Sequence, residues 1–507
     1  MRWNGYQDTE QLVSNIYRRY IEMALKTPQQ YIDSVKKLRP RVFIGGERVE
    51  NLVERPNIKP VIDTMAKTYE LALDSKYEDF TPATSHLTGE KISRWTHVPR
   101  SIDDLWKRRN LNLIMAQKTG SCNYRCMGQE ALQILASVTY AMDQKLGTEY
   151  HKRFNNFLRY MQENDLAANM PQTDARGDRS KSPSEQEDPD SYLHVVEKRS
   201  DGIVVRGAKL HQVGAMVCHE HICAPFTPLH KGEEDYAVAF AIPNGTEGLT
   251  YICQSGPIEA ERRQAQSIQE LGIPEYGSIF TSMLVFDDVF VPWERVFMCG
   301  EVEFAADLLK KFASMHHVLC RGSCKVGFMD LMIGAAQTIA EYNGIATATH
   351  VRDKITEMIR IRETTEACTT AAVGNGKEDP PGSGVYFPNT MFSLMGSLNT
   401  HYGFPQVALL AADLAGGSVV TMPSERELQN PETSQYVRKY LKGVASVPTE
   451  YRMRMLKFLQ HWTAGPQVAA MWDEGSLQVS RALVRGEALA VLEEKKKLAK
   501  ELAGIKD

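Results

Sequence analysis

The chain has 507 residues, of which 43% are hydrophobic and 24% are charged, and its formal net charge is −4. This is too long for one compact core, and the composition is that of a globular protein without the basic excess of a nucleic-acid-binding protein. The N-terminus lacks the apolar core of a secretory signal, and no window reaches the ~18 consecutive apolar residues of a membrane span. We therefore expect a cytoplasmic protein with no nucleic-acid or membrane partner.

Residues 1–164 are predicted to form a helical N-terminal domain. Apolar residues recur there at helical spacing, for example Leu105 and Leu111, then Leu132 and Leu135. A loop rich in Pro, Ser and charge follows at 170–190. The nine cysteines of the chain are an odd number, which favours reduced thiols or metal ligands over a disulfide framework.

Residues 165–300 are predicted to form a middle β domain. Short β-branched runs are separated by turn signals, and the Asp201-Gly202 turn favours a hairpin. The predicted strands are 192–198, 203–209, 236–242, 249–253 and 282–286.

Residues 301–507 are predicted to form a C-terminal helical bundle, since long amphipathic segments return there. The whole is an α+β chain without a Rossmann or P-loop motif.

Cys122 and Cys126 lie in the stretch T-G-S-C-N-Y-R-C-M-G, residues 119–128. In a helix the two thiols would share one face, and the C-x3-C spacing lets them reach neighbouring irons of one cluster. Two buried core cysteines are the simpler interpretation of such a pair.

A second group, M-H-H-V-L-C-R-G-S-C-K-V-G, spans residues 315–327. In an α-helix His317, Cys320 and Cys324 would project the same way, whereas His316 would point about 100° away. These side chains could meet the first pair across a helix interface. A contact between small residues around a core histidine is the alternative.

The segment C-H-E-H-I-C, residues 218–223, is a third candidate. On a strand His219 and His221 would face one side, as a zinc pair does. No further ligand with metal spacing follows, so we favour buried or substrate-facing histidines.

Two segments, 173–181 and 206–214, offer polar side chains and backbone N–H groups that neighbouring glycines leave accessible. Such groups suit a cofactor's pyrophosphate or flavin ring. A solvated loop and a β-turn are equally consistent with them.

At these positions the sequence resembles the 4-hydroxyphenylacetate 3-hydroxylase superfamily, and within it the 4-hydroxybutyryl-CoA dehydratase branch. The resemblance runs from about Thr27 to the C-terminus. It rests on T-P-Q-Q-Y-I-D-S-V-K-K-L, Q-K-T-G-S-C-N-Y-R-C, D-G-I-V-V-R-G-A-K-L-H-Q, L-V-F-D-D-V-F-V-P and C-K-V-G. It implies an acyl-CoA dehydrogenase-like fold with a helical N-terminal domain, a β-barrel-like middle domain and a C-terminal bundle, assembled as a homotetramer.

The resemblance also implies two cofactors, FAD and a [4Fe-4S] cluster. The cluster ligands would be Cys122, Cys126, His317 and Cys324, with His317 also acting as a catalytic base and Lys325 as a further catalytic residue. Cys320 would be an extra thiol or a rival ligand. The FAD contacts would be Gln172, Thr173, Asp174, Asp178, Arg179, His211, Gln212, Val213 and Gly214.

The implied reaction is dehydration or isomerisation of a 4-hydroxyacyl-CoA by a radical mechanism. Two alternatives remain: an aromatic monooxygenase that uses FADH2 from a partner reductase, and a non-catalytic paralogue that keeps the cluster. Five polar residues of the branch are replaced, which predicts a related but less polar substrate. The positions are Leu113, Tyr124, Val213, Thr281 and Ala469.

Overall fold

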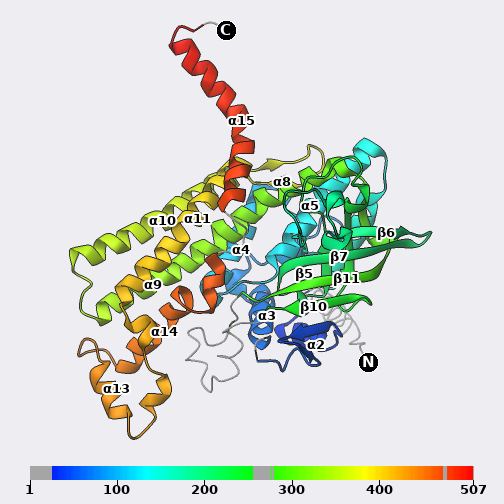
Figure 1. The fold of residues 1–507 in the computed structure, drawn as a ribbon. Helices are drawn as coiled ribbons and strands as arrows, with labels where there is room; N and C mark the ends of the chain where they lie inside the picture. The colour runs from blue at the N-terminus through cyan, green and yellow to red at the C-terminus, as the bar shows by residue number, and fades with distance from the viewer. Residues whose placement is uncertain (1–24, 57, 255–275, 277–278, 472–476, 506–507) are drawn as a thin grey trace, which may run out of the picture.

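The computed structural model describes residues 25–56, 58–254, 276, 279–471 and 477–505 (Figure 1). A mainly helical part is followed by a β part and then by a bundle of long helices, which confirms the predicted order of parts in an α+β fold. The first 24 residues of the predicted N-terminal domain lie outside the described residues.

The N-terminal part is built around helix α4, which has clear start and stop signals. The Ser101 hydroxyl accepts a hydrogen bond from the Asp104 amide (3.1 Å) at its start, and Gly120 ends it in the left-handed conformation. The helices are α2 (Pro28–Val35), α3 (Lys59–Leu73), α4 (Ile102–Thr119), α5 (Cys126–Leu146) and α6 (Tyr150–Glu163). The strands are β1 (Arg41–Ile44), β2 (Glu47–Val49), β3 (Pro82–Thr84) and β4 (Lys91–Ser93).

The middle part contains the predicted strands. They are β5 (Ala168–Asn169), β6 (His194–Lys198), β7 (Gly202–Val213), β8 (Glu220–Cys223), β9 (Val238–Pro243), β10 (Leu249–Cys253), β11 (Thr281–Pro292) and β12 (Val296–Cys299). The Asp201-Gly202 turn joins β6 and β7 as an antiparallel hairpin, as predicted. β7 and β11 run further than expected and pair along most of their length.

The middle strands form two separate open sheets, so in the described residues the expected barrel is not closed. One sheet has the order β2-β1-β10-β11-β7-β6 and the other β12-β9-β8-β5. The first includes the hairpin β1–β2 of the N-terminal part, because β1 pairs in parallel with β10 and covers its edge.

The C-terminal part places α9, α10 and α11 side by side (Figure 1). Its helices are α8 (Ala305–His316), the π-helix η10 (His317–Cys324), α9 (Lys325–Tyr342), α10 (Thr349–Gly374), α11 (Thr390–Ala415), α12 (Ser418–Thr421), α13 (Ser434–Tyr440), α14 (Thr449–Thr463), the 3-10 helix η12 (Pro466–Met471) and α15 (Leu477–Leu502). A two-stranded hairpin, β13 (Lys377–Glu378) and β14 (Tyr386–Phe387), follows α10. The second half of α15 projects from the body (Figure 1).

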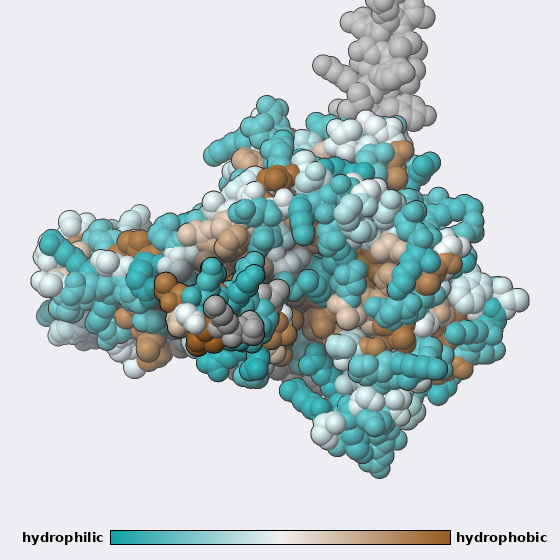
Figure 2. All heavy atoms as spheres, turned by 90° about the horizontal axis from the view of Figure 1, so that it is seen from above, coloured by the Kyte–Doolittle hydropathy of each residue, from teal (hydrophilic) through white to brown (hydrophobic). Residues whose placement is uncertain are grey.

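Among the described residues, the three largest apolar cores hold the parts together. The first lies between the six-stranded sheet and α2 and α3, the second between the four-stranded sheet and α5 and α6, and the third inside the helical bundle. On the face drawn in Figure 2, hydrophobic residues lie in small separate groups among hydrophilic ones. Among the described residues, no helix is long and apolar enough to span a membrane.

Candidate active site

Cys122 and Cys126 do not share a helix, which corrects the prediction of a helical C-x3-C pair. Gly120 ends α4, Tyr124 turns the chain with a φ of 60°, and Cys126 is the first residue of α5. Cys122 therefore lies in the loop between the two helices. The loop folds back so that the two thiols still form a side-chain hydrogen bond.

The Cys126 thiol is fully enclosed, and Cys324 lies within electrostatic reach of it. The hydrogen bond with Cys122 and then burial raise the pKa of the Cys126 thiol well above its usual range, and Glu130 and Cys324 add to the effect. Cys126 therefore stays protonated at neutral pH unless a cation compensates the thiolate charge.

Cys324 lies at the end of η10, a π-helix of eight residues that begins at His317. The Ser323 hydroxyl donates to the carbonyl of Val318 (2.8 Å) within this helix. A π-helix has more residues per turn than an α-helix, so the prediction that His317, Cys320 and Cys324 share one α-helical face was wrong. His317 and Cys324 are buried, whereas Cys320 is half-buried.

Close packing between α9 and α4 holds Cys324 beside the first cysteine pair. A Cβ on Gly327 would lie 2.8 Å from the Ala116 Cβ and 3.2 Å from the carbonyl oxygen of Leu113. Only glycine permits this approach of the two helices. Cys122 and Cys324 consequently contact the same apolar cluster of the bundle.

His316 has its own acidic neighbour. Its Nδ1 lies 2.9 Å from a carboxylate oxygen of Glu130, which is fully buried on α5, and its ring stacks on Phe312 with centroids 4.6 Å apart. The assignment of His317 as the metal ligand stays a prediction. Among the residues that the structure describes, no three His, Cys, Asp or Glu side chains converge on a point for a single metal ion.

The segment that begins with Gln172, Thr173 and Asp174 lies against the end of β7. The Leu210 amide donates to the Thr173 carbonyl (2.6 Å), and the Lys209 ammonium donates to the Gln172 carbonyl (2.9 Å). Lys209 also forms a buried ion pair with Asp174 (2.7 Å). This pairing brings the first predicted flavin segment next to the turn at 211–214.

The turn itself has an irregular backbone. His211 and Gly214 have φ angles of 60° and 63°, and the Gly214 amide donates to the Phe280 carbonyl (2.9 Å). A Cβ on Gly214 would lie 2.7 Å from Cδ1 of Tyr124, so the Tyr124 ring packs directly on this glycine. The cysteine loop and the predicted flavin turn are therefore in contact.

Two further predicted flavin residues lie elsewhere on the surface. Asp178 and Arg179 are exposed, and the Asp178 carboxylate accepts hydrogen bonds from the amide and the hydroxyl of Ser180 (3.0 and 2.7 Å). Gln212 is buried and Val213 half-buried, and they pair with Ser282 and Thr281 of β11.

Of the five replaced pocket positions, Leu113, Tyr124 and Val213 lie near the cysteines. Leu113 and Val213 pack on the apolar cluster that Cys122 and Cys324 contact. Thr281 lies opposite Val213, and its hydroxyl donates to Oε1 of Gln254 (2.7 Å). Ala469 belongs to η12, and its side chain lies outside the described part of the structure.

Lys325, the first residue of α9, is buried and directly follows Cys324. Its ammonium lies 5.7 Å from the ring centroid of Phe328 and 5.6 Å from that of Phe404. Such aromatic faces stabilise a cation away from water.

The histidines of C-H-E-H-I-C are buried, as we favoured. His219 Nδ1 accepts the Ala167 amide (3.0 Å) and its Nε2 lies 2.7 Å from the Ser34 hydroxyl. His221 Nε2 lies 2.6 Å from the Tyr251 hydroxyl. Burial lowers the pKa of each histidine to about 3. The two rings thus serve the fold as neutral hydrogen-bonding groups.

Three polar residues around the cysteine loop were missed by sequence reasoning. Arg125 forms a buried ion pair with Asp165 (3.0 Å), and Gln467 of η12 donates to the Gly120 carbonyl (2.9 Å). Asn123 makes hydrogen bonds on both sides of the loop. The positions of Asn123 and Arg125 between the two cysteines could have indicated these two residues. The sequence carries no such signal for Gln467.

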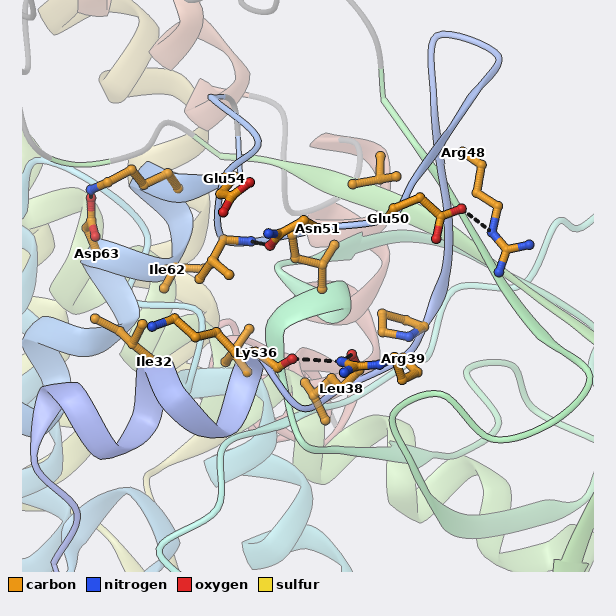
Figure 3. Close-up of a pocket in the computed structure, with 16 residues that line it drawn as sticks. Ile32, Lys36, Leu38, Arg39, Arg48, Glu50, Asn51, Glu54, Ile62 and Asp63 are labelled. Atoms are coloured by element: carbon orange, nitrogen blue, oxygen red, sulfur yellow. Dashed lines mark hydrogen bonds and ion pairs between the residues drawn. The ribbon is translucent and has the colours of Figure 1, made fainter.

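A hollow of about 680 Å³ lies between α2, the β1–β2 hairpin and α3 (Figure 3). Its charged groups are in part paired with each other, as Arg48 with Glu50 (3.3 Å) and Lys59 with Asp63 (2.5 Å). None of the predicted site residues lines it.

Comparison with known proteins gives matches along nearly the whole chain. The family models described as 4-hydroxyphenylacetate 3-hydroxylase N terminal and C terminal match residues 27–298 and 305–504. The 4-hydroxybutyryl-CoA dehydratase/vinylacetyl-CoA-Delta-isomerase of Clostridium aminobutyricum is 40% identical over 496 residues, which cover 95% of this chain and 100% of the relative. The 4-hydroxyphenylacetate 3-monooxygenase oxygenase component of Thermus thermophilus is 28% identical, over 86% of this chain and 88% of the relative.

Solved structures agree with these matches. The oxygen-tolerant archaeal 4-hydroxybutyryl-CoA dehydratase from N. maritimus superposes with a TM-score of 0.90 at 37% identity, over 95% of this chain and 96% of that one. The oxygenase component HpaB of 4-hydroxyphenylacetate 3-monooxygenase, solved with FAD, has the same fold with a TM-score of 0.82 at 24% identity, over 94% of this chain and 99% of that one.

The fold and these relatives define the class of protein: an enzyme of the dehydratase kind, a lyase, with monooxygenases as more distant relatives. The chain belongs to the 4-hydroxyphenylacetate 3-hydroxylase family, and within it to the 4-hydroxybutyryl-CoA dehydratase branch. This confirms the resemblance drawn from the sequence motifs.

Proposed function

We propose that the protein is a dehydratase and isomerase of a 4-hydroxyacyl-CoA, dependent on FAD and a [4Fe-4S] cluster. The observation that carries the proposal is the meeting of Cys122, Cys126 and Cys324, from two domains, beside the turn at 211–214. The 40% identity to a dehydratase along the whole chain supports the same reaction class.

Cys122, Cys126, Cys324 and His317 would hold the cluster. Each ligand of a four-iron cluster binds a different iron, so the ligands need not converge on one point. Two N–H groups already point at these sulfurs: the Tyr124 backbone amide donates to Cys122 Sγ (3.4 Å), and the Asn123 side-chain Nδ2 donates to Cys324 Sγ (3.9 Å). Such donors stabilise the negative charge of metal-bound thiolates.

The flavin would be held by the segment 172–174 and the turn at 211–214, with Asp178 and Arg179 reaching it from their exposed loop. At this turn His211 and Gly214 have positive φ angles, and the Tyr124 ring packs on Gly214. Arg179 would supply a positive charge to the pyrophosphate. Its exposure suits a contact at a subunit interface.

When bound, the flavin would exchange single electrons with the substrate, and the cluster would serve as a Lewis acid for the leaving hydroxyl. The chain's own residues would orient the acyl group and move its protons. Once its ring nitrogen is released from iron, the His317 imidazole would take a proton from a substrate carbon. The Lys325 ammonium, held among aromatic rings, would stabilise negative charge on the thioester carbonyl.

The substrate would be 4-hydroxybutyryl-CoA or a less polar relative of it. Leu113 and Val213 present apolar surface next to Cys122. A buried pocket of this kind disfavours additional polar groups on the acyl chain.

We further propose a homotetramer of a cytoplasmic enzyme. The outer half of α15 carries apolar residues that the described chain leaves exposed, such as Leu498 and Leu502 at 65% and 93%. A projecting amphipathic helix of this length is stabilised by packing on another copy of the chain.

Anaerobic purification followed by metal and flavin analysis tests the proposal. We expect about four iron atoms and one FAD per chain, and turnover of 4-hydroxybutyryl-CoA to crotonyl-CoA. Bound FAD without iron, together with hydroxylation of a phenol in the presence of a flavin reductase, would identify the protein as a monooxygenase instead. Full cofactors without turnover of any acyl-CoA would indicate a non-catalytic paralogue.

Two variants separate the roles of the ligands. Cys126→Ser should abolish the visible absorbance of the cluster and lower the iron content, and unchanged colour would refute the ligand assignment. His317→Ala with the cluster retained should lose activity if the imidazole is the base. Unchanged turnover in that variant would exclude this role.

A further inference from the structure

Asn123 lies between the two cysteines of the loop and is completely buried. Its side-chain oxygen Oδ1 accepts hydrogen bonds from the backbone amides of Arg125 and Cys126, both at 2.9 Å. It thereby fixes the first residue of α5 by an Asx turn that leads into the helix. The thiol-bearing residue Cys126 is positioned by this contact.

The side-chain nitrogen of Asn123 faces away from α5, toward α4 and η10. The Asn123 amide nitrogen donates to Oδ1 of Asn112 on α4 (2.9 Å) and to Sγ of Cys324 on η10 (3.9 Å). Asn112 is buried as well and donates to the Arg108 carbonyl (2.9 Å) of its own helix. One amide group therefore ties together the start of α5, the helix α4 and the second cysteine segment.

The contacts also fix which end of the amide faces the sulfur. An Asn side chain offers two donors on nitrogen and two acceptor positions on oxygen. If the amide were rotated by 180°, its NH2 group would face the two backbone N–H donors of Arg125 and Cys126. The oxygen must therefore face α5, and the nitrogen must face Cys324.

We infer that Asn123 is a positioning residue that holds Cys126 and Cys324 in register and donates an N–H to the Cys324 sulfur. This inference rests on the proposed function, since it assigns Cys324 to the cluster. Hydrogen bonds to cluster sulfurs help to set the reduction potential. The donor on Cys324 stabilises the more negative, reduced form and raises the midpoint potential.

Two substitutions separate the hydrogen bond to the Cys126 amide from the hydrogen bond to the Cys324 sulfur. Asn123→Ser keeps an oxygen that can accept from the Cys126 amide but is too short to reach Cys324. We expect it to retain the iron of the wild type while its midpoint potential shifts to more negative values. Asn123→Ala removes both contacts, and we expect a loss of most of the iron.

Iron and sulfide content and the midpoint potential are measured on anaerobically purified full-length protein. Asn399→Ser is the matched control, because Asn399 donates to the Ile361 carbonyl (3.1 Å) and Thr365 hydroxyl (2.8 Å) between α10 and α11. It should leave both readouts at the wild-type value.

Wild-type iron content and potential in both Asn123 variants would overturn the inference while leaving the proposed function intact. Absence of iron from the wild type would instead remove the proposed cluster. The two failures are thus distinguishable by the wild-type analysis alone.

Discussion

Gly214 and Tyr124 form the contact between the predicted flavin turn and the cysteine loop. Gly214 has a φ of 63°, which costs an L-residue roughly 1–2 kcal/mol, and a Cβ there would clash with the Tyr124 ring. We predict that Gly214→Ala lowers the melting temperature and the flavin content of the purified protein.

A double-mutant cycle with Tyr124→Ala isolates the clash from the backbone cost. The double variant should lose less stability than the sum of the single variants, because the missing ring leaves room for the new methyl group. Strictly additive losses in urea denaturation would show that the contact is not what requires glycine.

Arg125 and Asp165 are each almost fully enclosed, at 2% and 1% side-chain exposure. Removing one member of a buried ion pair leaves an uncompensated charge and costs about 3–5 kcal/mol. We predict a loss of this size for Arg125→Met in urea denaturation. The double variant Arg125→Met with Asp165→Asn should be more stable than Arg125→Met alone, and equal stability of the two would contradict the argument.

His221 on strand β8 and His219 directly before it should make the stability of the β domain depend on pH. Burial lowers the pKa of His219 and His221 to about 3, from about 6.5 in the unfolded chain. Because the folded pKa is depressed, the stabilising contribution is present above pH 6.5 and is lost as the pH falls from 6.5 toward 3.

The melting temperature should therefore decrease between pH 7 and pH 5. Where the unfolded histidine is protonated and the folded one is neutral, the free energy of unfolding falls by about 1.4 kcal/mol per histidine for each pH unit. His221→Gln, which retains a partner for the Tyr251 hydroxyl, should flatten this dependence. A slope identical to that of the wild type would show that His221 does not bind a proton on unfolding.

At the level of elements, patterns that repeat along the chain predicted the fold well. β-branched runs and the Asp201-Gly202 turn located the hairpin β6–β7, and apolar spacing located α4 and α5. The pairing of β1 with β10 could not be predicted, because it joins segments about 200 residues apart whose apolar patterns fit many partners.

The site was predicted less completely, because its geometry departs from regular helices. Periodicity assumes an unbroken α-helix, yet Tyr124 turns the cysteine loop and η10 is a π-helix. The choice of His317 came from the family resemblance and not from spacing. The partners of Asn123 could not be inferred, since they lie on three different helices.

At the scale of the whole molecule, we expect the projecting half of α15 to form a contact between subunits. Its first half is anchored on the bundle by the Ser480 to His401 hydrogen bond (3.0 Å) and by the Lys310 to Glu487 ion pair (2.8 Å). We predict that deletion of residues 488–507 leaves the fold intact but reduces the proposed tetramer to smaller species in size-exclusion chromatography with light scattering. A truncated chain that remains tetrameric would place the interface elsewhere.

The two cysteine segments are far apart in the sequence, since Asn123 beside the first pair and Cys324 are 201 positions apart. A bound cluster would act as a covalent cross-link that closes a loop containing the entire β domain. Closing so long a loop removes conformational entropy from the unfolded chain, so the cofactor would stabilise the fold as well as serve the reaction. Removal of the iron should then let the N-terminal domain and the bundle unfold in separate steps.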